Sequence, residues 1–250
     1  MPTRNREGRI GAAIASIVQQ TMDLWELIVV DDHSDEEDAT EEVVRSFGDS
    51  RIRYYRLPDH HGRNSACARN FGNALSRASF IAVADSDDIF YSHRLELTMA
   101  AFDAQDCDVF YSDFDVWNED TNSYVDMSRF PAAPCEIEGL KRYDMVPHGS
   151  LAYRRELSLR YPYNSFMTRS GDYDLITRLA EARMKFHFCP VKTYCYRLHA
   201  GNLLKSFDTM QFDQFLKQSR GWQPFDPSLA HELVAAFSSR AEKRERAGDL

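Results

Sequence analysis

The sequence lacks the long apolar runs and paired cysteines that mark several protein classes. No window approaches eighteen uninterrupted apolar residues, so we expect no membrane-spanning helix. The N-terminus has no basic region followed by an apolar core, and so it shows no secretory signal. The five cysteines are odd in number and form no CxxC pair. This usage favours reduced, mostly buried thiols in a cytoplasmic protein.

Basic residues are also too few for a nucleic-acid partner. The formal net charge is -9, whereas proteins that bind nucleic acids carry a basic bias. With 43% hydrophobic and 28% charged residues, the composition is ordinary for a globular chain. A length of 250 residues fits one large domain, or one domain with an appendage.

The first half of the chain alternates strand-like runs with helical patterns. Strands are expected at 25–32, 51–58, 80–87 and 108–116, and helices at 9–22, 39–47, 65–78 and 93–104. This order predicts an α/β fold, with an open, mostly parallel, Rossmann-like sheet flanked by helices. Ligand sites in such sheets gather at the carboxyl ends of the strands.

The second half is less regular. Residues 117–147 carry prolines and polar residues, which predict loop with at most short elements. A helix is expected at 172–184, an aromatic strand at 185–199 and a C-terminal helical extension at 206–250.

An acidic cluster follows the expected third strand at Asp85-Ser86-Asp87-Asp88. Carboxylates two apart at a strand end can converge on a hard cation such as Mg²⁺ or Mn²⁺. A turn or a helix N-cap is the ordinary alternative. Asp113 and Asp115 have the same spacing inside a strand, and we interpret them as structural.

Other polar residues also stand at element ends. Asp31 and Asp32 close a strand and could accept hydrogen bonds from a nucleobase or a ribose, or could cap the next helix. Arg63 and Arg69 lie near a helix start, where an anionic ligand or plain solvent would suit them.

The last candidates lie in the second half of the chain. Asp172 opens a helix, as an N-cap or as a general base. Arg197 could contact phosphate and His199 a metal, although a histidine after a strand is usually neither.

A series of motifs occurs in a fixed order along residues 2–200. They are PTRN at 2–5, Gln20-Thr21, WELIVVDDHS at 25–34, RIRYYRLPDHHGRNSACARN at 51–70, FIAVADSDD at 80–88, HGSLAYRRE at 148–156 and GDYDLITRL at 171–179. Together they resemble the family-2 nucleotide-sugar glycosyltransferases, which have the GT-A fold.

The resemblance implies inverting transfer of a sugar from a nucleoside-diphosphate donor, expected to be UDP-linked, to an acceptor hydroxyl. A GT-A domain at 1–205 would combine a nucleotide-binding half, 1–115, with an acceptor and catalytic half, 116–205. The acceptor would be a saccharide or a glycolipid. Many such enzymes work at the inner membrane face, so peripheral membrane contact by a cytoplasmic protein is a hypothesis here.

The same resemblance implies a role for each matching residue. The residues that would bind the nucleotide are Pro2, Thr3, Arg4, Asp32, Arg69 and Asp85. Asp87 and His199 would bind Mn²⁺ or Mg²⁺ as cofactor, and this cation, arriving with the donor, would supply the positive charge beside the acidic cluster. Sugar or acceptor contacts fall to His148, Gly171 and Arg197, and the catalytic base would be Asp172.

The chain departs from the family pattern at three points. The family has an apolar strand directly before PTRN, whereas this sequence starts at Met1, so we expect a missing or truncated first strand. Arg4 replaces an aromatic residue that often stacks on the base, and a guanidinium can also stack. Gly171 replaces a commoner glutamate.

Two other functions stay open at this point. A sugar nucleotidyltransferase would need a glycine-rich phosphate loop after its first strand, and PTRNREGR is a poor version of one. A degenerate domain that binds nucleotide without turnover would agree with the missing strand, but Asp87 and Asp172 are retained.

Overall fold

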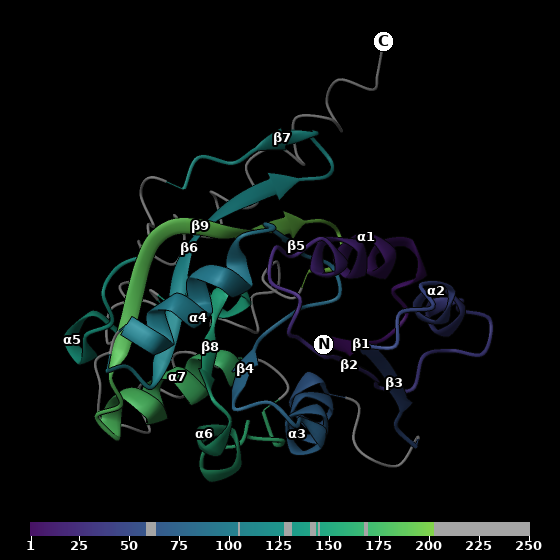
Figure 1. Cartoon of the computed structure of the whole chain (residues 1–250). Coiled ribbons are helices and arrows are strands. Elements are labelled where there is room, and N and C mark those ends of the chain that lie inside the picture. Colours follow the sequence, from purple (N-terminus) through teal and green to yellow (C-terminus); the bar gives the residue numbers. More distant parts are fainter. Residues whose placement is uncertain are drawn as a thin grey trace.

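The structure is a computed structural model that describes residues 1–58, 64–104, 106–127, 132–140, 144, 146–167 and 170–202 (Figure 1). The strands are β1 (Pro2–Thr3), β2 (Leu27–Asp31), β3 (Ile52–Arg56), β4 (Phe80–Ala82), β5 (Ile89–Phe90), β6 (Val109–Asn118), β7 (Ser123–Tyr124), β8 (Ala152–Arg154) and β9 (Phe186–Leu198). The helices are α1 (Glu7–Val18), α2 (Thr40–Ser46), α3 (Ser65–Leu75), α4 (Arg94–Ala104), α5 (Ile137–Leu140), α6 (Arg155–Arg160) and α7 (Gly171–Glu181), with a 3₁₀ turn η2 (His148–Ser150).

The first sheet is parallel, in the order β1-β2-β3. All five residues of β2 are buried, as expected of a strand covered on both faces. Because side chains alternate along a strand, Leu27 and Val29 pack with α1 and α2, whereas Ile28 and Val30 pack toward α3. The unbroken apolar run therefore reflects helices on both sides of the strand.

The second sheet has the order β4-β8-β6-β9-β5, with β7 paired to β6. Only β6 and β9 pair in parallel, through a ladder with register shifts around Asp113. The pairs β4–β8, β6–β8, β5–β9 and β6–β7 are antiparallel. The sequence predicts one mostly parallel sheet, whereas the structure has a parallel first sheet and a mixed second sheet. This difference arises mainly because β8 lies between β4 and β6 and runs opposite to both.

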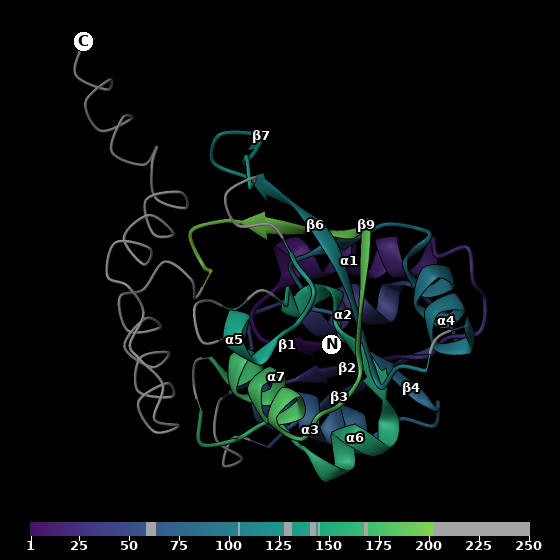
Figure 2. The same cartoon turned by 90° about the vertical axis from the view of Figure 1, so that its left-hand side faces the viewer.

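The strand β1 has two residues. Its partners on β2 are Val30 and Asp31, so within the described residues β1 pairs only with the carboxyl end of β2. Within the described residues, β1 ends one sheet and β4 ends the other, with no ladder between them. Figure 2 shows β1, β2 and β3 beneath the crossing of β6 and β9, with α6 and α7 at the opposite edge from α1.

Most elements expected from the sequence are present near the expected residues. The strand expected at 80–87 ends at Ala82, which leaves Asp85, Asp87 and Asp88 in the following turn. Asp115 accepts hydrogen bonds from Tyr91 Oη and Lys192 Nζ, each at 2.6 Å, which agrees with a structural role. Arg63 and the extension at 206–250 lie outside the described residues.

No helix in the described part of the chain is both long and apolar enough to cross a membrane.

Candidate active site

Asp31, the last residue of β2, anchors the loop that follows the strand. It is fully buried, and its carboxylate accepts hydrogen bonds from Ser34 N–H at 2.7 Å, Ser34 Oγ at 2.9 Å and Tyr54 Oη at 2.5 Å. Three donors offset the cost of burying the charge. Asp31 therefore shapes the loop, and its neighbour Asp32 stands beside β1, where its N–H donates to Thr3 O at 2.9 Å.

The loops after β1 and β2 are tied together through Asn5. Asn5 has a φ of 50°, and its N–H donates to Ser34 Oγ at 2.9 Å. Its side chain donates to the Asp35 carboxylate at 2.7 Å and accepts from Asp35 N–H at 2.8 Å. Arg4 lies 4.0 Å from the same carboxylate. The sequence-predicted nucleotide residues Pro2, Thr3, Arg4 and Asp32 thus meet at one edge of the first sheet.

Arg69, Asp85 and His148 form a second group. Arg69 Nη2 lies 2.5 Å from Asp85 Oδ1, and His148 Nδ1 lies 3.8 Å from Asp85 Oδ2. Burial alone would raise the pKa of Asp85, but the Arg69 guanidinium and then His148 hold it well below its usual range. The sequence separated these residues into nucleotide and sugar roles, and the structure brings them together.

Tyr163 completes this group from the other half of the chain. His148 Nε2 lies 2.9 Å from Tyr163 Oη, and the Arg69 guanidinium lies 5.5 Å from the Tyr163 ring. Gly149 allows the turn η2, which carries His148, to pack closely against Tyr194. A Cβ at position 149 would lie 2.3 Å from the buried Tyr194 ring. Gly149 lies inside the HGSLAYRRE motif, whereas no sequence signal singled out Tyr163.

Asp87 forms a third group with Arg6 and His199. Asp87 Oδ2 lies 3.2 Å from His199 Nε2 and 3.4 Å from Arg6 Nε. His199 is almost fully buried, and its Nδ1 accepts a hydrogen bond from Gly201 N–H at 3.0 Å. Since Nδ1 is the acceptor, Nε2 carries the proton and donates to Asp87. A metal bound at Nε2 would have to displace that proton.

Arg197 holds the acidic turn from β9. Its Nε donates to Asp87 O, and its N–H donates to Asp88 Oδ1 at 3.0 Å. Burial, followed by the charges of Asp85 and Asp87, raises the pKa of Asp88 well above its usual range. Glu119 in turn lies 3.6 Å from the Arg197 guanidinium and 2.8 Å from that of Arg9.

These contacts correct one expectation. The positive charge beside the acidic turn was expected to come from a bound cation, but Arg6, Arg69 and Arg197 already contact it within the chain. Arg6 could have been suspected, since it lies just after PTRN. Its pairing with a residue 81 positions further on depends on how the two sheets meet, which local sequence does not encode.

Asp172 stands apart from these ion pairs. It lies in the first turn of α7, after Ser170 with a φ of 53°, and its Oδ1 accepts from Tyr173 N–H at 2.9 Å. Among the described residues it forms no ion pair. Burial lowers the pKa of the Arg69 guanidinium, but Asp85 and, to a smaller extent, the more distant Asp172 raise it above its usual value. The Asp172 carboxylate is thus near enough to Arg69 to affect it electrostatically.

Gly171 is not required by steric contacts. A Cβ at this position would lie 3.9 Å from Met167 Cβ, which is ordinary van der Waals contact. The structure thus leaves room for a side chain where glycine replaces a glutamate.

Within the described ranges, no three His, Cys, Asp or Glu side chains gather closely enough to hold a metal by themselves. Asp87 and His199 offer two donors, and Asp85 is turned to Arg69. Magnesium and manganese sites of nucleotide-using enzymes often take one or two protein ligands and complete the shell with phosphate oxygens and water. The donor set fits a metal of that kind.

Comparison with solved structures defines the class of the fold. A *Staphylococcus aureus* TarS fragment in complex with UDP-GlcNAc matches with a TM-score of 0.69 and 19% identity, over 94% of this chain and 69% of that one. The mannosyltransferase PcManGT from *Pyrobaculum calidifontis*, in complex with GDP-Man and Mn²⁺, matches at 0.65 with 15% identity, over 100% and 74%. The fold is therefore the GT-A fold of glycosyltransferases.

Sequence comparison identifies the family. The model described as Glycosyl transferase family 2 matches residues 1–176. UDP-Glc:alpha-D-GlcNAc-diphosphoundecaprenol beta-1,3-glucosyltransferase WfgD of *Escherichia coli* is 33% identical over 95% of this chain and 88% of its own length. The putative colanic acid biosynthesis glycosyl transferase WcaA of *E. coli* K12 is 30% identical over 72% and 64%. The chain belongs to glycosyl transferase family 2 and is a glycosyltransferase.

Proposed function

We propose that this glycosyltransferase transfers a sugar from a UDP-sugar to an acceptor hydroxyl with inversion, assisted by a divalent metal and with Asp172 as the general base. The proposal rests on one observation: three carboxylates differ in whether they form ion pairs. Asp85 and Asp87 are held by cationic side chains, whereas Asp172 forms no ion pair among the described residues.

The donor would lie across the carboxyl ends of β1, β2 and β4. Pro2, Thr3, Arg4 and Asp32 would surround the nucleoside, and Arg69 with Asp85 would follow toward the diphosphate. Two similar proteins favour uridine, since WfgD is named for UDP-Glc and TarS was solved with UDP-GlcNAc. GDP is the competitor to test, because PcManGT was solved with GDP-Man.

Charge developing on the leaving diphosphate is the main electrostatic demand of the reaction. Arg6 and Arg197 stand beside Asp87 and would offer fixed positive charge that needs no reorganisation during the step. Asp87 and His199 would hold Mn²⁺ or Mg²⁺. When bound, that ion would neutralise part of the diphosphate charge.

Asp172 would take the proton of the acceptor hydroxyl as the new glycosidic bond forms. A neutral hydroxyl is a poor nucleophile, so a carboxylate at hydrogen-bond distance lowers the barrier. Direct displacement of the diphosphate from the opposite face of the anomeric carbon inverts its configuration. A retaining route would need a second carboxylate to attack the sugar, and here Asp85 is engaged with Arg69.

The acceptor is proposed to be a saccharide or a glycolipid, with His148, Gly171 and Arg197 near the transferred sugar. Support comes from WfgD, whose name includes a diphosphoundecaprenol-linked acceptor. We also propose a cytoplasmic location with peripheral contact at the inner membrane face.

The test is turnover of UDP-sugars in the presence of Mn²⁺, by the unchanged chain, Asp172→Asn and Asp87→Ala. The account expects hydrolysis or transfer by the unchanged chain, loss of turnover with retained UDP binding in Asp172→Asn, and weaker UDP binding in Asp87→Ala. If the unchanged chain binds UDP tightly but turns over no donor, the catalytic proposal fails. A domain that binds nucleotide without turnover would then take its place.

A further inference from the structure

A buried polar network connects α3 with the acidic turn. It consists of Asn73, Tyr153, Tyr163, His148 and Asp85. Asn73 Nδ2 donates to Tyr153 Oη at 3.2 Å, and Tyr163 Oη lies 2.9 Å from His148 Nε2. The two tyrosine hydroxyls lie close enough to interact with each other. Tyr153 is 2% exposed and Tyr163 is 3% exposed, so the network is shielded from solvent.

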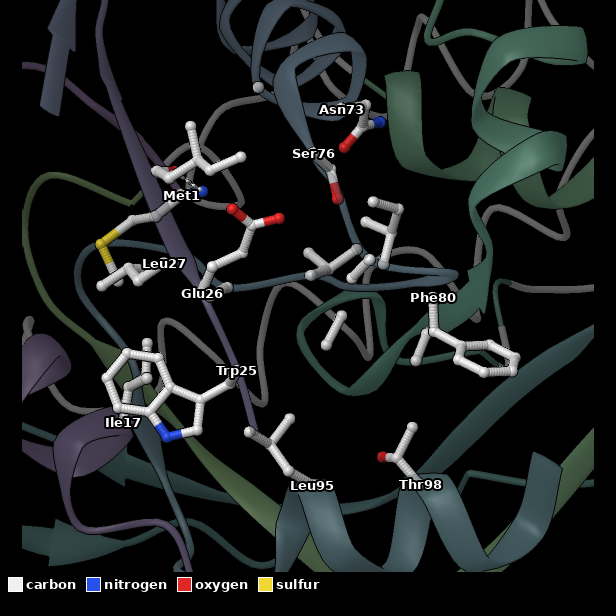
Figure 3. Close-up of a pocket in the computed structure, with 18 of the residues that line it drawn as sticks. Met1, Ile17, Trp25, Glu26, Leu27, Asn73, Ser76, Phe80, Leu95 and Thr98 are labelled. Atoms are coloured by element: carbon white, nitrogen blue, oxygen red, sulfur yellow. Dashed lines mark hydrogen bonds between the residues drawn. The ribbon is translucent and has the colours of Figure 1, made fainter. Parts of the chain in front are cut away.

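The helix α3 holds this network at three positions. Arg69 pairs with the acidic turn, and Asn73 lies one helical turn further on. Asn70 fixes the backbone of Tyr163 by two hydrogen bonds, because it accepts from the Tyr163 N–H at 2.9 Å and donates to the Tyr163 carbonyl oxygen at 2.8 Å. A cavity of about 420 Å³ lies behind these residues, between the two sheets, and Figure 3 shows Asn73 on its α3 side. One helix therefore places the Tyr163 hydroxyl and the Arg69 guanidinium relative to each other.

The direction of the hydrogen bonds follows from the Asn73 end of the network. An amide nitrogen can only donate, so Tyr153 Oη accepts from Asn73 and its own proton is left to point toward the Tyr163 oxygen. Burial raises the pKa of Tyr163 well above its usual range, so this hydroxyl also keeps a proton to donate. The acceptor within reach is His148 Nε2, which is therefore the unprotonated nitrogen of the imidazole.

The Asp85 end of the network requires the same arrangement. In a neutral imidazole one nitrogen carries the proton and the other has a lone pair. A bare Nδ1 of His148 would direct its lone pair at Asp85 Oδ2, 3.8 Å away, whereas an Nδ1–H directs a positive hydrogen at the same oxygen. The second arrangement is favoured by electrostatic attraction, although the distance is longer than that of a hydrogen bond. Both ends of the network thus place the proton of His148 on Nδ1.

We propose that Tyr163 is a positioning residue for donor binding, and that its hydroxyl donates to His148 Nε2 and so holds the imidazole with its Nδ1–H toward Asp85. Asp85 is then fixed at both oxygens, by Arg69 at Oδ1 and by His148 at Oδ2. Because the His148 side chain is only 9% exposed, it acts on the site through Asp85. The effect on binding rests on the proposed function, in which Arg69 and Asp85 hold the nucleotide.

The most direct test is the position of the His148 proton in the unchanged chain, measured without nucleotide. Imidazole nitrogens with and without a proton have well-separated nitrogen chemical shifts in NMR, and the spectrum of a His148→Gln variant identifies the signals. At a pH about two units above the ordinary pKa of histidine, we expect a proton on Nδ1 and none on Nε2. A proton on Nε2 overturns the proposal, because Tyr163 is then the acceptor.

Tyr163→Phe removes the hydroxyl and keeps the ring. The His148 imidazole then loses its fixed orientation, so its Nε2 signal should shift and UDP should bind about 3–10-fold more weakly. The value of kcat at saturating donor should stay within about twofold, because Asp172 lies outside the network. Tyr161→Phe is the matched control, since it removes a hydroxyl two residues away from a ring that lies 5.4 Å from the Arg160 guanidinium. It should change none of these quantities.

A double-mutant cycle tests whether Tyr163 acts through His148. Once alanine replaces His148, Tyr163→Phe should weaken UDP binding by less than about twofold. Full additivity of the two losses overturns the positioning role, and so does an equal loss of affinity in the Tyr161→Phe control. If the unchanged chain binds UDP, an unaltered affinity in Tyr163→Phe overturns it as well. The NMR measurement needs no nucleotide, so it decides the arrangement of the network even if UDP is not the ligand.

Discussion

The two ends of β2 are built in opposite ways. At the carboxyl end, Asp31 has three hydrogen-bond donors and the adjoining loops are locked through Asn5 and Ser34. At the amino end, Leu27 and Ile28 border a cavity, and the neighbouring strand is only two residues long. β1 thus pairs only with the carboxyl end of β2, where side-chain hydrogen bonds maintain the loops, and the cavity borders the amino end. Stability and site geometry are supplied by different residues of the same strand.

The largest effect is expected on kcat, from a substitution at Asp172. Asp172→Asn removes the proposed base and keeps the shape of the side chain, so kcat should fall by a factor of about 10²–10⁴. UDP affinity should stay within about twofold, because binding does not use that proton. Steady-state kinetics and calorimetry on the same preparation measure the two quantities. Loss of UDP binding in step with kcat would contradict the assignment.

Alanine substitutions at two leucines compare the packed core with the cavity wall. Leu175→Ala shortens a side chain that α7 buries in the core, and it should cost about 3–4 kcal/mol of unfolding free energy. Leu27→Ala should cost about 1–2 kcal/mol, because one side of Leu27 already borders empty space. Urea denaturation gives both values. Equal costs would mean that the cavity is effectively filled in solution.

The Met1 amino group makes the cavity end sensitive to pH. Its pKa is about 5 when folded and 8.0 in the reference state, so the unfolded chain binds more protons between these values. Stability should therefore rise with pH, by ~2 kcal/mol between pH 6 and 8.5. Thermal unfolding across this range measures the rise. N-terminal acetylation is the control, and an unchanged slope after acetylation would assign the pH dependence to another group.

Tyr54→Phe tests the hydrogen bonds that hold Asp31 and the loop after β2. It removes the hydroxyl that donates to buried Asp31, and about 1–2 kcal/mol of stability should be lost. UDP binding should weaken as well, since Asp31 positions the loop that carries Asp32. Phenylalanine in place of Tyr55, whose side chain lies on the other face of β3, is the matched control. A larger UDP effect in that control would contradict the role given to Asp31.

Much of the fold follows from the sequence because strong local patterns specify it. The run at 25–32 is apolar throughout, and the structure buries all of β2 between helices. The patterns before and after it likewise gave α1 and α2 within a few residues. By contrast β8 and β5 are only three and two residues long. Such short strands carry no periodicity, and pairing with distant strands alone defines them.

In the candidate site, too, local patterns predict some features and contacts between distant residues determine the rest. Asp85, Asp87 and Asp172 were expected because each stands at the end of a patterned element. The pairing of Asp87 with Arg6 and the approach of Tyr163 to His148 cross between elements far apart in sequence. The cavity was not predicted, and its lining by α3 and α4 depends on packing that no local pattern specifies.

The most direct test of the account is UDP binding and UDP-sugar turnover, with Mn²⁺ present, by the unchanged chain and by Asp172→Asn. The account predicts that both proteins bind UDP with similar affinity and that only the unchanged chain turns over a donor at an appreciable rate. Turnover by Asp172→Asn at the rate of the unchanged chain would contradict it.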